Sequence, residues 1–243
     1  MTLASDILAA CIEKGLRIAT AESCTGGMVA AALTDIPGSS AVFERGFVTY
    51  TNTAKSEMLG VREATLAAHG AVSEQVAREM ALGALVNSDA EIAVAITGIA
   101  GPGGSEFKPE GRVCFGLATD RGCITETVEF GATGRPFVRA AARDHALGLL
   151  LVSGVALCGG QAMLSDSNGK WCECLFTSPA LLALHYVKVV LGVPAIAQAV
   201  PITVDTAFRR PPLESLPASG FWSKSAQSSN SGPDVRSSTR LFA

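Results

Sequence analysis

The sequence predicts a three-layer α/β/α domain with a mixed, mostly parallel sheet of about five strands, followed by a poorly structured C-terminal extension. Short apolar runs alternate with amphipathic helical segments, which is typical of helices packed on both faces of a sheet. Two later strand-like runs, over 112–119 and 123–130, are joined by a short Asp-Arg-Gly connection, as in an antiparallel hairpin. The composition changes after residue 153, so we expect the domain to cover 1–153.

Each element follows from a local pattern. Strands are expected where short apolar or alternating runs are stopped by polar residues or glycine. Helices are expected where apolar residues recur at helical spacing, often behind a Ser, Thr or Asn that can cap them. The run over 91–97 is nearly all apolar, as in a strand buried on both faces. In order, we expect a helix over 2–14, a strand over 16–20, a helix over 28–33, a strand over 43–50, short helices over 54–59 and 62–68, a helix over 73–87, strands over 91–97, 112–119 and 123–130, and a helix over 135–151.

Residues 154–243 differ from the domain in composition. They hold both tryptophans, and from Pro211 onward the sequence is rich in Ser and Pro, as in disordered segments. The apolar stretch over 181–200 is interrupted by His185, Lys188 and Pro194, so it falls short of a convincing membrane span. We therefore expect 154–243 to be an atypical, largely disordered extension.

Composition and charge exclude several classes of function. The net charge of −3 offers no electrostatic attraction to nucleic acid or to an anionic membrane. No basic and then apolar leader opens the sequence, and the seven cysteines are odd in number and irregularly spaced. Reduced thiols in a cytoplasmic protein are the expectation, with no nucleic-acid or membrane partner.

The stretch Ala21-Glu22-Ser23-Cys24-Thr25-Gly26-Gly27 is the centre of the functional interpretation. It connects an expected strand to an expected helix, and the first N–H groups of a helix lack internal partners, so such a junction can bind an anion. A serine at this point can also present its hydroxyl to a substrate. The alternative is that Ser23 or Thr25 only caps the helix.

A serine nucleophile requires a base that removes its proton. The three histidines, His69, His145 and His185, show no triad pattern, and lysine is the established substitute. Lys55 follows the expected strand that ends at Tyr50, so neighbouring strands would bring it to the edge where Ser23 lies. The alternatives are that Lys55 is an ordinary surface lysine and that Cys24 is the nucleophile.

Two other features lie where a ligand could bind. A glycine-rich loop over 98–104 follows a strand, but it matches neither the dinucleotide fingerprint nor a Walker loop. Arg135 and Arg139 begin the last helix and could hold a phosphate, unless they simply form an exposed helix end. Cys172 and Cys174 have no second pair nearby, so we expect no metal site.

Together these segments resemble the C-terminal domain of the competence/damage-inducible CinA proteins, a family whose domain also exists alone as nicotinamide-nucleotide amidohydrolase. The resemblance covers most of residues 5–152. It rests on seven motifs in the same order: AESCTGG at 21–27, PGSS at 37–40, FxRGFVTY at 43–50, NxAK at 52–55, LGV at 59–61, GAVS at 70–73 and TGIAGPGG at 97–104.

The resemblance implies hydrolysis of the amide of nicotinamide mononucleotide, a pyridine nucleotide, to nicotinic acid mononucleotide and ammonia. It implies Ser23 as nucleophile, Lys55 as base and Tyr50 as an assisting group, with no cofactor and with a homodimer as the assembly. We expect the oxyanion to be held by N–H groups at the start of the helix after Ser23, and we expect Tyr50 to relay protons. The alternative function is a non-catalytic nucleotide-binding regulatory module. The expected substrate-binding residues are Thr25, Gly26, Gly27, Thr97, Gly98, Gly101, Arg135 and Arg139.

Overall fold

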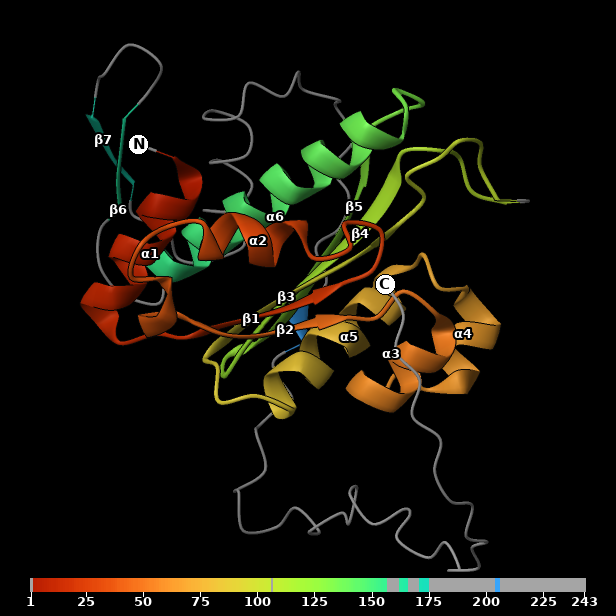
Figure 1. Cartoon of the computed structure of the whole chain (residues 1–243), viewed down its shortest axis with the longest axis horizontal. Coiled ribbons are helices and arrows are strands. Elements are labelled where there is room, and N and C mark those ends of the chain that lie inside the picture. Colours follow the sequence, from red (N-terminus) through yellow and green to blue (C-terminus); the bar gives the residue numbers. More distant parts are fainter. Residues whose placement is uncertain (1, 106, 157–161, 166–170, 175–203, 206–243) are drawn as a thin grey trace, which may run out of the picture. The chain divides into compact units, whose positions relative to one another are not determined.

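The computed structural model describes residues 2–105, 107–156, 162–165, 171–174 and 204–205. In the first 156 residues, alternating helices and strands are followed by three successive helices, three successive strands and a last helix (Figure 1). The helices are α1 (Leu3–Lys14), α2 (Met28–Thr34), α3 (Asn52–Leu59), α4 (Glu63–His69), α5 (Glu74–Val86) and α6 (Arg135–Ala156), with a 3-10 turn η1 (Ser39–Ala41). The strands are β1 (Ile18–Glu22), β2 (Phe43–Val48), β3 (Ile92–Gly98), β4 (Arg112–Thr119), β5 (Gly122–Glu129), β6 (Ala162–Ser165), β7 (Trp171–Cys174) and β8 (Val204–Asp205).

The main sheet has the strand order β2-β1-β3-β4-β5-β8. Strand β1 pairs in parallel with both β2 and β3, whereas β4 pairs antiparallel with β3 and with β5. Four of the five expected strands thus point the same way, and β4 alone among these five is reversed. The prediction of a mixed, mostly parallel sheet of about five strands is confirmed, and the two-residue strand β8 adds a sixth beside β5.

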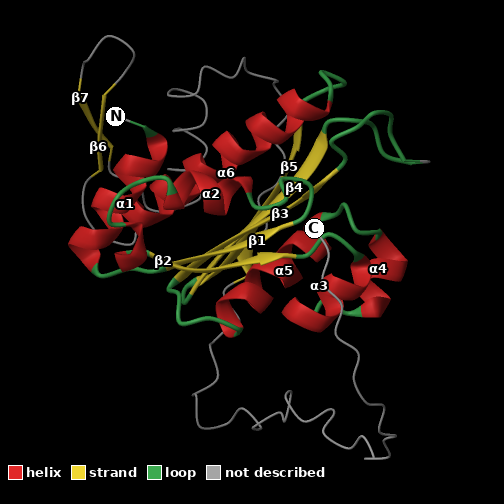
Figure 2. Cartoon of the chain, in the orientation of Figure 1, coloured by secondary structure: helices red, strands yellow, loops and turns green. Residues whose placement is uncertain are grey.

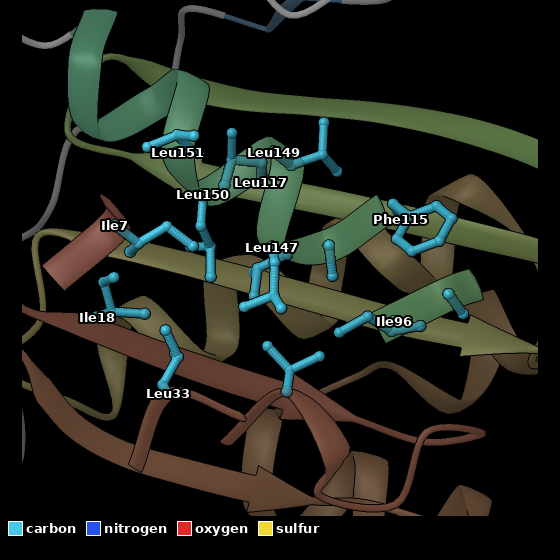
Figure 3. Close-up of a cluster of buried hydrophobic side chains, with 14 of the residues drawn as sticks. Ile7, Ile18, Leu33, Ile96, Phe115, Leu117, Leu147, Leu149, Leu150 and Leu151 are labelled. Carbon is cyan, nitrogen blue, oxygen red and sulfur yellow. The ribbon is translucent and has the colours of Figure 1, made fainter. Parts of the chain in front are cut away.

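Helices cover both faces of the sheet. Helices α1, α2 and α6 lie on one face, and α3, α4 and α5 lie on the other (Figures 1 and 2). The strands direct large side chains to the first face and alanines to the second: in β3, Ile92, Val94 and Ile96 belong to one buried cluster, and Ala93 and Ala95 to the other. Figure 3 shows the larger cluster, in which side chains of α1, α2 and α6 pack on the sheet.

Small residues let α5 approach the sheet closely. A methyl group added at Gly116 in β4 would lie 2.5 Å from the carbonyl oxygen of Ala77 in α5, well inside van der Waals contact. The alanines of β1 and β3 on the same face leave room for Val76 and Met80 of α5, which are fully buried. This close packing fixes α5 against the strands whose ends form the site described below.

Most element boundaries differ from the predicted ones by at most two residues, and the largest difference is the end of α6, expected at 151 and found at Ala156. Strand β1 is displaced as a whole by two residues. That strand was expected over 16–20 but spans Ile18–Glu22. The N–H of Leu16 donates to the carbonyl of Cys11, so Leu16 completes the C-terminal cap of α1 instead of starting the strand. Most of the extension over 154–243 lies outside the described residues, and its predicted disorder therefore stays a prediction. Among the described residues, no helix is long and apolar enough to cross a membrane.

Candidate active site

Three parallel strands end within two residues of one another at one edge of the sheet. Glu22, the last residue of β1, is paired with Val48 of β2 and with Ile96 of β3. Two backbone hydrogen bonds extend this register beyond the strands: the N–H of Ser23 donates to the carbonyl of Ile96, and the N–H of Thr49 donates to the carbonyl of Glu22. Residues that follow β1, β2 and β3 therefore meet at this edge, as expected for parallel strands.

Ser23 and Lys55 lie in direct contact at this edge. The Nζ atom of Lys55 is 3.0 Å from the Oγ atom of Ser23 and 2.9 Å from the carbonyl oxygen of Thr49. Helix α3 places Lys55 there because the Thr51 side chain caps it immediately after β2, accepting the N–H of Ala54. The Lys55 side chain is only 1% exposed. It is therefore a buried lysine, and the surface-lysine alternative is wrong.

Burial lowers the pKa of Lys55 below the ordinary lysine value of 10.5, because the charged ammonium loses its hydration. The opposing influence is the nearby Cys24 thiol, which would favour the ammonium if it were ionised. Burial, however, raises the pKa of Cys24 to about 11, so the thiol is neutral near pH 7. Lys55 is thus held toward its neutral amine form, and Cys24 is poorly suited to act as a nucleophile.

Residues 23–27, which we call the Ser23 turn, are held on one side by Glu22. The Glu22 carboxylate is fully buried and accepts hydrogen bonds from the N–H groups of Gly27, Val29 and Ala30, at 3.0, 3.1 and 2.9 Å. These are the N–H groups at the start of α2 that were expected to hold an oxyanion. The protein's own carboxylate therefore occupies three of the N–H groups at this helix start, and the location of the oxyanion hole stays a prediction.

Arg139 holds the other side of the Ser23 turn. From α6, its Nε atom donates to the carbonyl oxygen of Cys24 at 3.0 Å, and its Nη2 atom donates to that of Thr25 at 2.8 Å. A methyl group added at Gly26 would lie 3.5 Å from the same guanidinium, and the φ of +62° at Gly26 also disfavours a side chain. Thr25 is fully buried, and its hydroxyl has no hydrogen-bond partner among the described residues.

Arg135 lies one helical turn before Arg139 and makes different contacts. Its Nη1 atom donates to the carbonyl of Gly101 in the glycine-rich loop, at 2.9 Å, and its Nη2 atom donates to the Tyr50 hydroxyl at 2.6 Å. Both Arg135 and Tyr50 are exposed. Among the described residues, no hydrogen bond joins the Tyr50 hydroxyl to Ser23 or Lys55. Arg135, Tyr50 and Gly101 therefore form an exposed group beside the Ser23 turn.

The remaining expected site residues lie at the end of β3. Thr97 is buried, and its hydroxyl donates to the carbonyl of Ala71 in the segment before α5, at 2.8 Å. Gly98 lies against β4, where an added methyl group would come 2.7 Å from the Val113 side chain. Thr97 and Gly98 both lie at the sheet edge that carries Ser23, and the contacts described for them are with other residues of the protein.

Two histidines lie within the described residues, and neither is joined to Ser23. His145 is buried against the Phe115 and Phe130 rings and pairs with Glu126. His69 ends α4, where its carbonyl accepts a hydrogen bond from Lys108. The described part of the chain contains no cluster of His, Cys, Asp and Glu side chains suited to a metal ion.

Sequence reasoning missed two members of this site. Glu22 was treated only as part of a motif, although a carboxylate that ends a buried strand and precedes a helix is a signal for helix capping. The carbonyl of Thr49 orients Lys55 through its backbone, so no side-chain pattern could reveal it. The expected neighbours Ser23 and Lys55 are brought together, whereas Tyr50 is joined to Arg135.

Comparison with known proteins identifies the family. The model of the CinA C-terminal domain matches residues 1–153. The chain belongs to the CinA C-terminal domain family. A curated relative from Escherichia coli strain K12, "Nicotinamide-nucleotide amidohydrolase PncC", is 55% identical over 148 residues, which are 60% of this chain and 90% of that protein. A "CinA-like protein" from Chloroherpeton thalassium is 65% identical over 108 residues, but these span 44% of this chain and only 26% of that longer protein.

Solved structures of CinA proteins share the fold. The crystal structure of the competence/damage-inducible protein CihA from Agrobacterium tumefaciens superposes with a TM-score of 0.60 at 51% identity, covering 61% of this chain and 92% of that one. A CinA superfamily protein from Escherichia coli superposes with a TM-score of 0.59 at 38% identity, covering 63% and 88%. The likeness supports the α/β architecture described above.

Proposed function

We propose that this protein hydrolyses the carboxamide of nicotinamide mononucleotide to nicotinic acid mononucleotide and ammonia, as part of pyridine nucleotide recycling. The observation that carries the proposal is the contact between the Ser23 hydroxyl and the buried amine of Lys55. A lysine held toward its neutral form beside a serine is the arrangement that Ser-Lys acyl transfer requires. The 55% identity to a protein named nicotinamide-nucleotide amidohydrolase supports the choice of substrate.

In the first half of the proposed reaction, the Lys55 amine takes the proton of Ser23 while Oγ forms a bond to the carboxamide carbon. The resulting Lys55 ammonium then gives a proton to the amide nitrogen, the C–N bond breaks, and ammonia leaves. In the second half, Lys55 deprotonates a water molecule that attacks the ester carbon. The ester bond to Oγ breaks, and Ser23 recovers its proton.

The oxyanion formed in both halves requires N–H donors near Ser23. The N–H groups of Gly27, Val29 and Ala30 are taken by Glu22, and that of Gly26 donates to the Ser23 carbonyl. The N–H groups of Cys24 and Thr25, which also face the Cys24 sulfur, and that of Met28 are the proposed donors. The one directly after the nucleophile fulfils this role in other serine hydrolases.

Arg135 is the proposed phosphate-binding residue. Its guanidinium is exposed beside the glycine-rich loop, whereas Arg139 donates to two backbone carbonyls. Tyr50 assists in this proposal by orienting Arg135 through the 2.6 Å hydrogen bond, in place of the proton relay expected from the sequence. Gly101, Thr97 and Gly98 shape the edge of the sheet around the ligand. We further propose a cytoplasmic homodimer that needs no metal or organic cofactor.

The test is release of ammonia from nicotinamide mononucleotide by the purified protein, with nicotinic acid mononucleotide identified as the second product. The Ser23→Ala variant is the control for contaminating amidases. The alternative, a nucleotide-binding regulatory module, would bind the nucleotide and release no ammonia from it. That outcome would overturn the catalytic proposal.

A further inference from the structure

We infer that Glu22 and Arg139 are positioning residues that hold the Ser23 turn from two sides, so that losing either one lowers turnover rather than substrate affinity. This inference rests on the proposed function. It assigns Arg139 to the geometry of the nucleophile, although the sequence suggested a role in binding the substrate.

Glu22 binds backbone N–H groups at the end of the Ser23 turn and at the start of α2. A fully buried carboxylate is stable only where hydrogen bonds replace its lost hydration, and here three backbone N–H groups supply them. Glu22 faces α2 because it lies on the same side of β1 as Ile18, which belongs to the cluster packed against α1, α2 and α6. The carboxylate therefore joins the end of β1 to the start of α2, and the Ser23 turn is the only chain between them.

Arg139 binds backbone carbonyl groups within the Ser23 turn. In a planar trans peptide the C=O and N–H groups point in opposite directions. By holding the carbonyls of Cys24 and Thr25, the guanidinium therefore directs the N–H groups of Thr25 and Gly26 away from α6. The N–H of Gly26 accordingly donates to the carbonyl of Ser23, which closes the turn. Arg139 thus prevents these peptide planes from rotating.

Both residues act on Ser23 through the backbone. The hydrogen bonds that the structure gives to the Ser23 hydroxyl and the Lys55 amine involve neither Glu22 nor Arg139. A free turn would let the Oγ atom move from its position 3.0 Å from Nζ, and a misplacement of about 1 Å can cost about a hundredfold in rate. The phosphate would still meet Arg135, so affinity should be kept.

The experiment measures kcat and KM for nicotinamide mononucleotide in Glu22→Gln and Arg139→Lys. Glutamine keeps the shape of Glu22 but directs an NH2 group at N–H donors, and lysine cannot hold two carbonyls with a planar fork. We expect kcat to fall about ten- to a hundredfold, while KM stays within about twofold. A KM that rises at unchanged kcat would show a substrate-binding role and overturn the inference.

Matched controls separate positioning from general stability. Glu79→Gln removes a carboxylate that accepts the N–H of Arg62 and the hydroxyl of Thr65 on the α5 face, and Arg143→Lys changes the next arginine along α6. Glu79→Gln should lower the melting temperature, Arg143→Lys should change it little because its ion pair with Asp144 is exposed, and neither should lower kcat. Equal losses of kcat in these controls would contradict the inference.

Chemical rescue tests Arg139 even if the Glu22 variant fails to fold. Millimolar guanidinium should restore part of the kcat of Arg139→Ala, because a free guanidinium can occupy the space between the two carbonyls. It should leave Lys55→Met inactive. Absence of rescue in a folded Arg139→Ala would overturn the role of Arg139. A wild-type protein that releases no ammonia would instead overturn the proposed function itself.

Discussion

The amine of Lys55 and the hydroxyl of Ser23 lie 3.0 Å apart although 32 positions of the chain separate them. They meet because β1 and β2 are parallel neighbours, and because α3 starts directly after β2. Burial of Lys55 then keeps its amine toward the neutral form. This pair is the basis of the following predictions.

Ser23→Ala should abolish amidase activity and leave the fold intact. Removing the nucleophile of a hydrolase costs roughly a thousandfold or more in kcat, because no other group can form the acyl-enzyme. Cys24→Ser should keep most of the activity, since the Cys24 thiol is neutral near pH 7. Steady-state rates of ammonia release, with circular dichroism of each variant, provide the comparison. The reverse pattern would make Cys24 the nucleophile.

The rate should fall on the acid side of the pH profile. Lys55 is the base only as the neutral amine, and its pKa lies below 10.5 because of burial. Protonation through that lowered pKa removes the base, so kcat/KM should decrease as pH falls. Lys55→Arg should be nearly inactive at every pH, because guanidinium stays protonated. Substantial activity in Lys55→Arg would exclude the proposed base.

Lys55 should also make stability depend on pH. Between its lowered pKa in the folded protein and about 10.5 in the unfolded chain, the unfolded state binds the extra proton. The free energy of unfolding should therefore rise with pH across that window. In Lys55→Met this contribution disappears. Urea midpoints of both proteins at several pH values would show it, and parallel curves would mean that the lysine is protonated in the folded protein.

Tyr50→Phe should raise KM for the phosphorylated substrate in particular. The variant loses the hydroxyl that accepts from Arg135, so KM for nicotinamide mononucleotide should rise, as it should in Arg135→Ala. The double variant should be little worse than Arg135→Ala, because both changes affect one interaction. Nicotinamide riboside, which lacks the phosphate, is the control substrate. A fall in kcat on both substrates would support the proton relay instead.

Residues after α6 should be dispensable for catalysis. Every site residue lies before residue 140, and about 150 residues suffice to bury a core. Truncation after Ala156 should therefore leave a soluble, active protein. A second truncation after Ser153 tests the predicted boundary, because it removes Gly154, whose carbonyl accepts a hydrogen bond from Lys14 of α1. Loss of activity in both would show that the extension completes the domain.

The sequence predicted the strands, the helices and the meeting of Ser23 with Lys55 because these follow from local pattern and from parallel pairing. It could not predict what Glu22 and Arg139 bind. Glu22 is polar at the end of an apolar run, and it was therefore assigned to the turn rather than to β1. Its burial is possible only because three N–H groups of a separate helix converge on it.

The different roles of Arg135 and Arg139 likewise could not be predicted from the sequence. Arg135 and Arg139 lie four residues apart on one face of a helix, so residue type and spacing treat them alike. The docking of α6 separates them: Arg139 reaches the carbonyls of Cys24 and Thr25, whereas Arg135 reaches Gly101 and Tyr50. Such a distinction depends on the tertiary position of the helix.

The contact of Arg139 with the Ser23 turn spans more than a hundred residues, from β1 at the beginning of the domain to α6 at its end. When Ser23 and Lys55 have emerged from the ribosome, the nascent chain still lacks Arg139, whose guanidinium orders the Ser23 turn. Hydrolysis should therefore begin only after α6 has emerged and folded back onto the sheet. The onset of ammonia release in a synchronised translation reaction would then report completion of the domain, and nascent fragments would leave the nucleotide pool untouched.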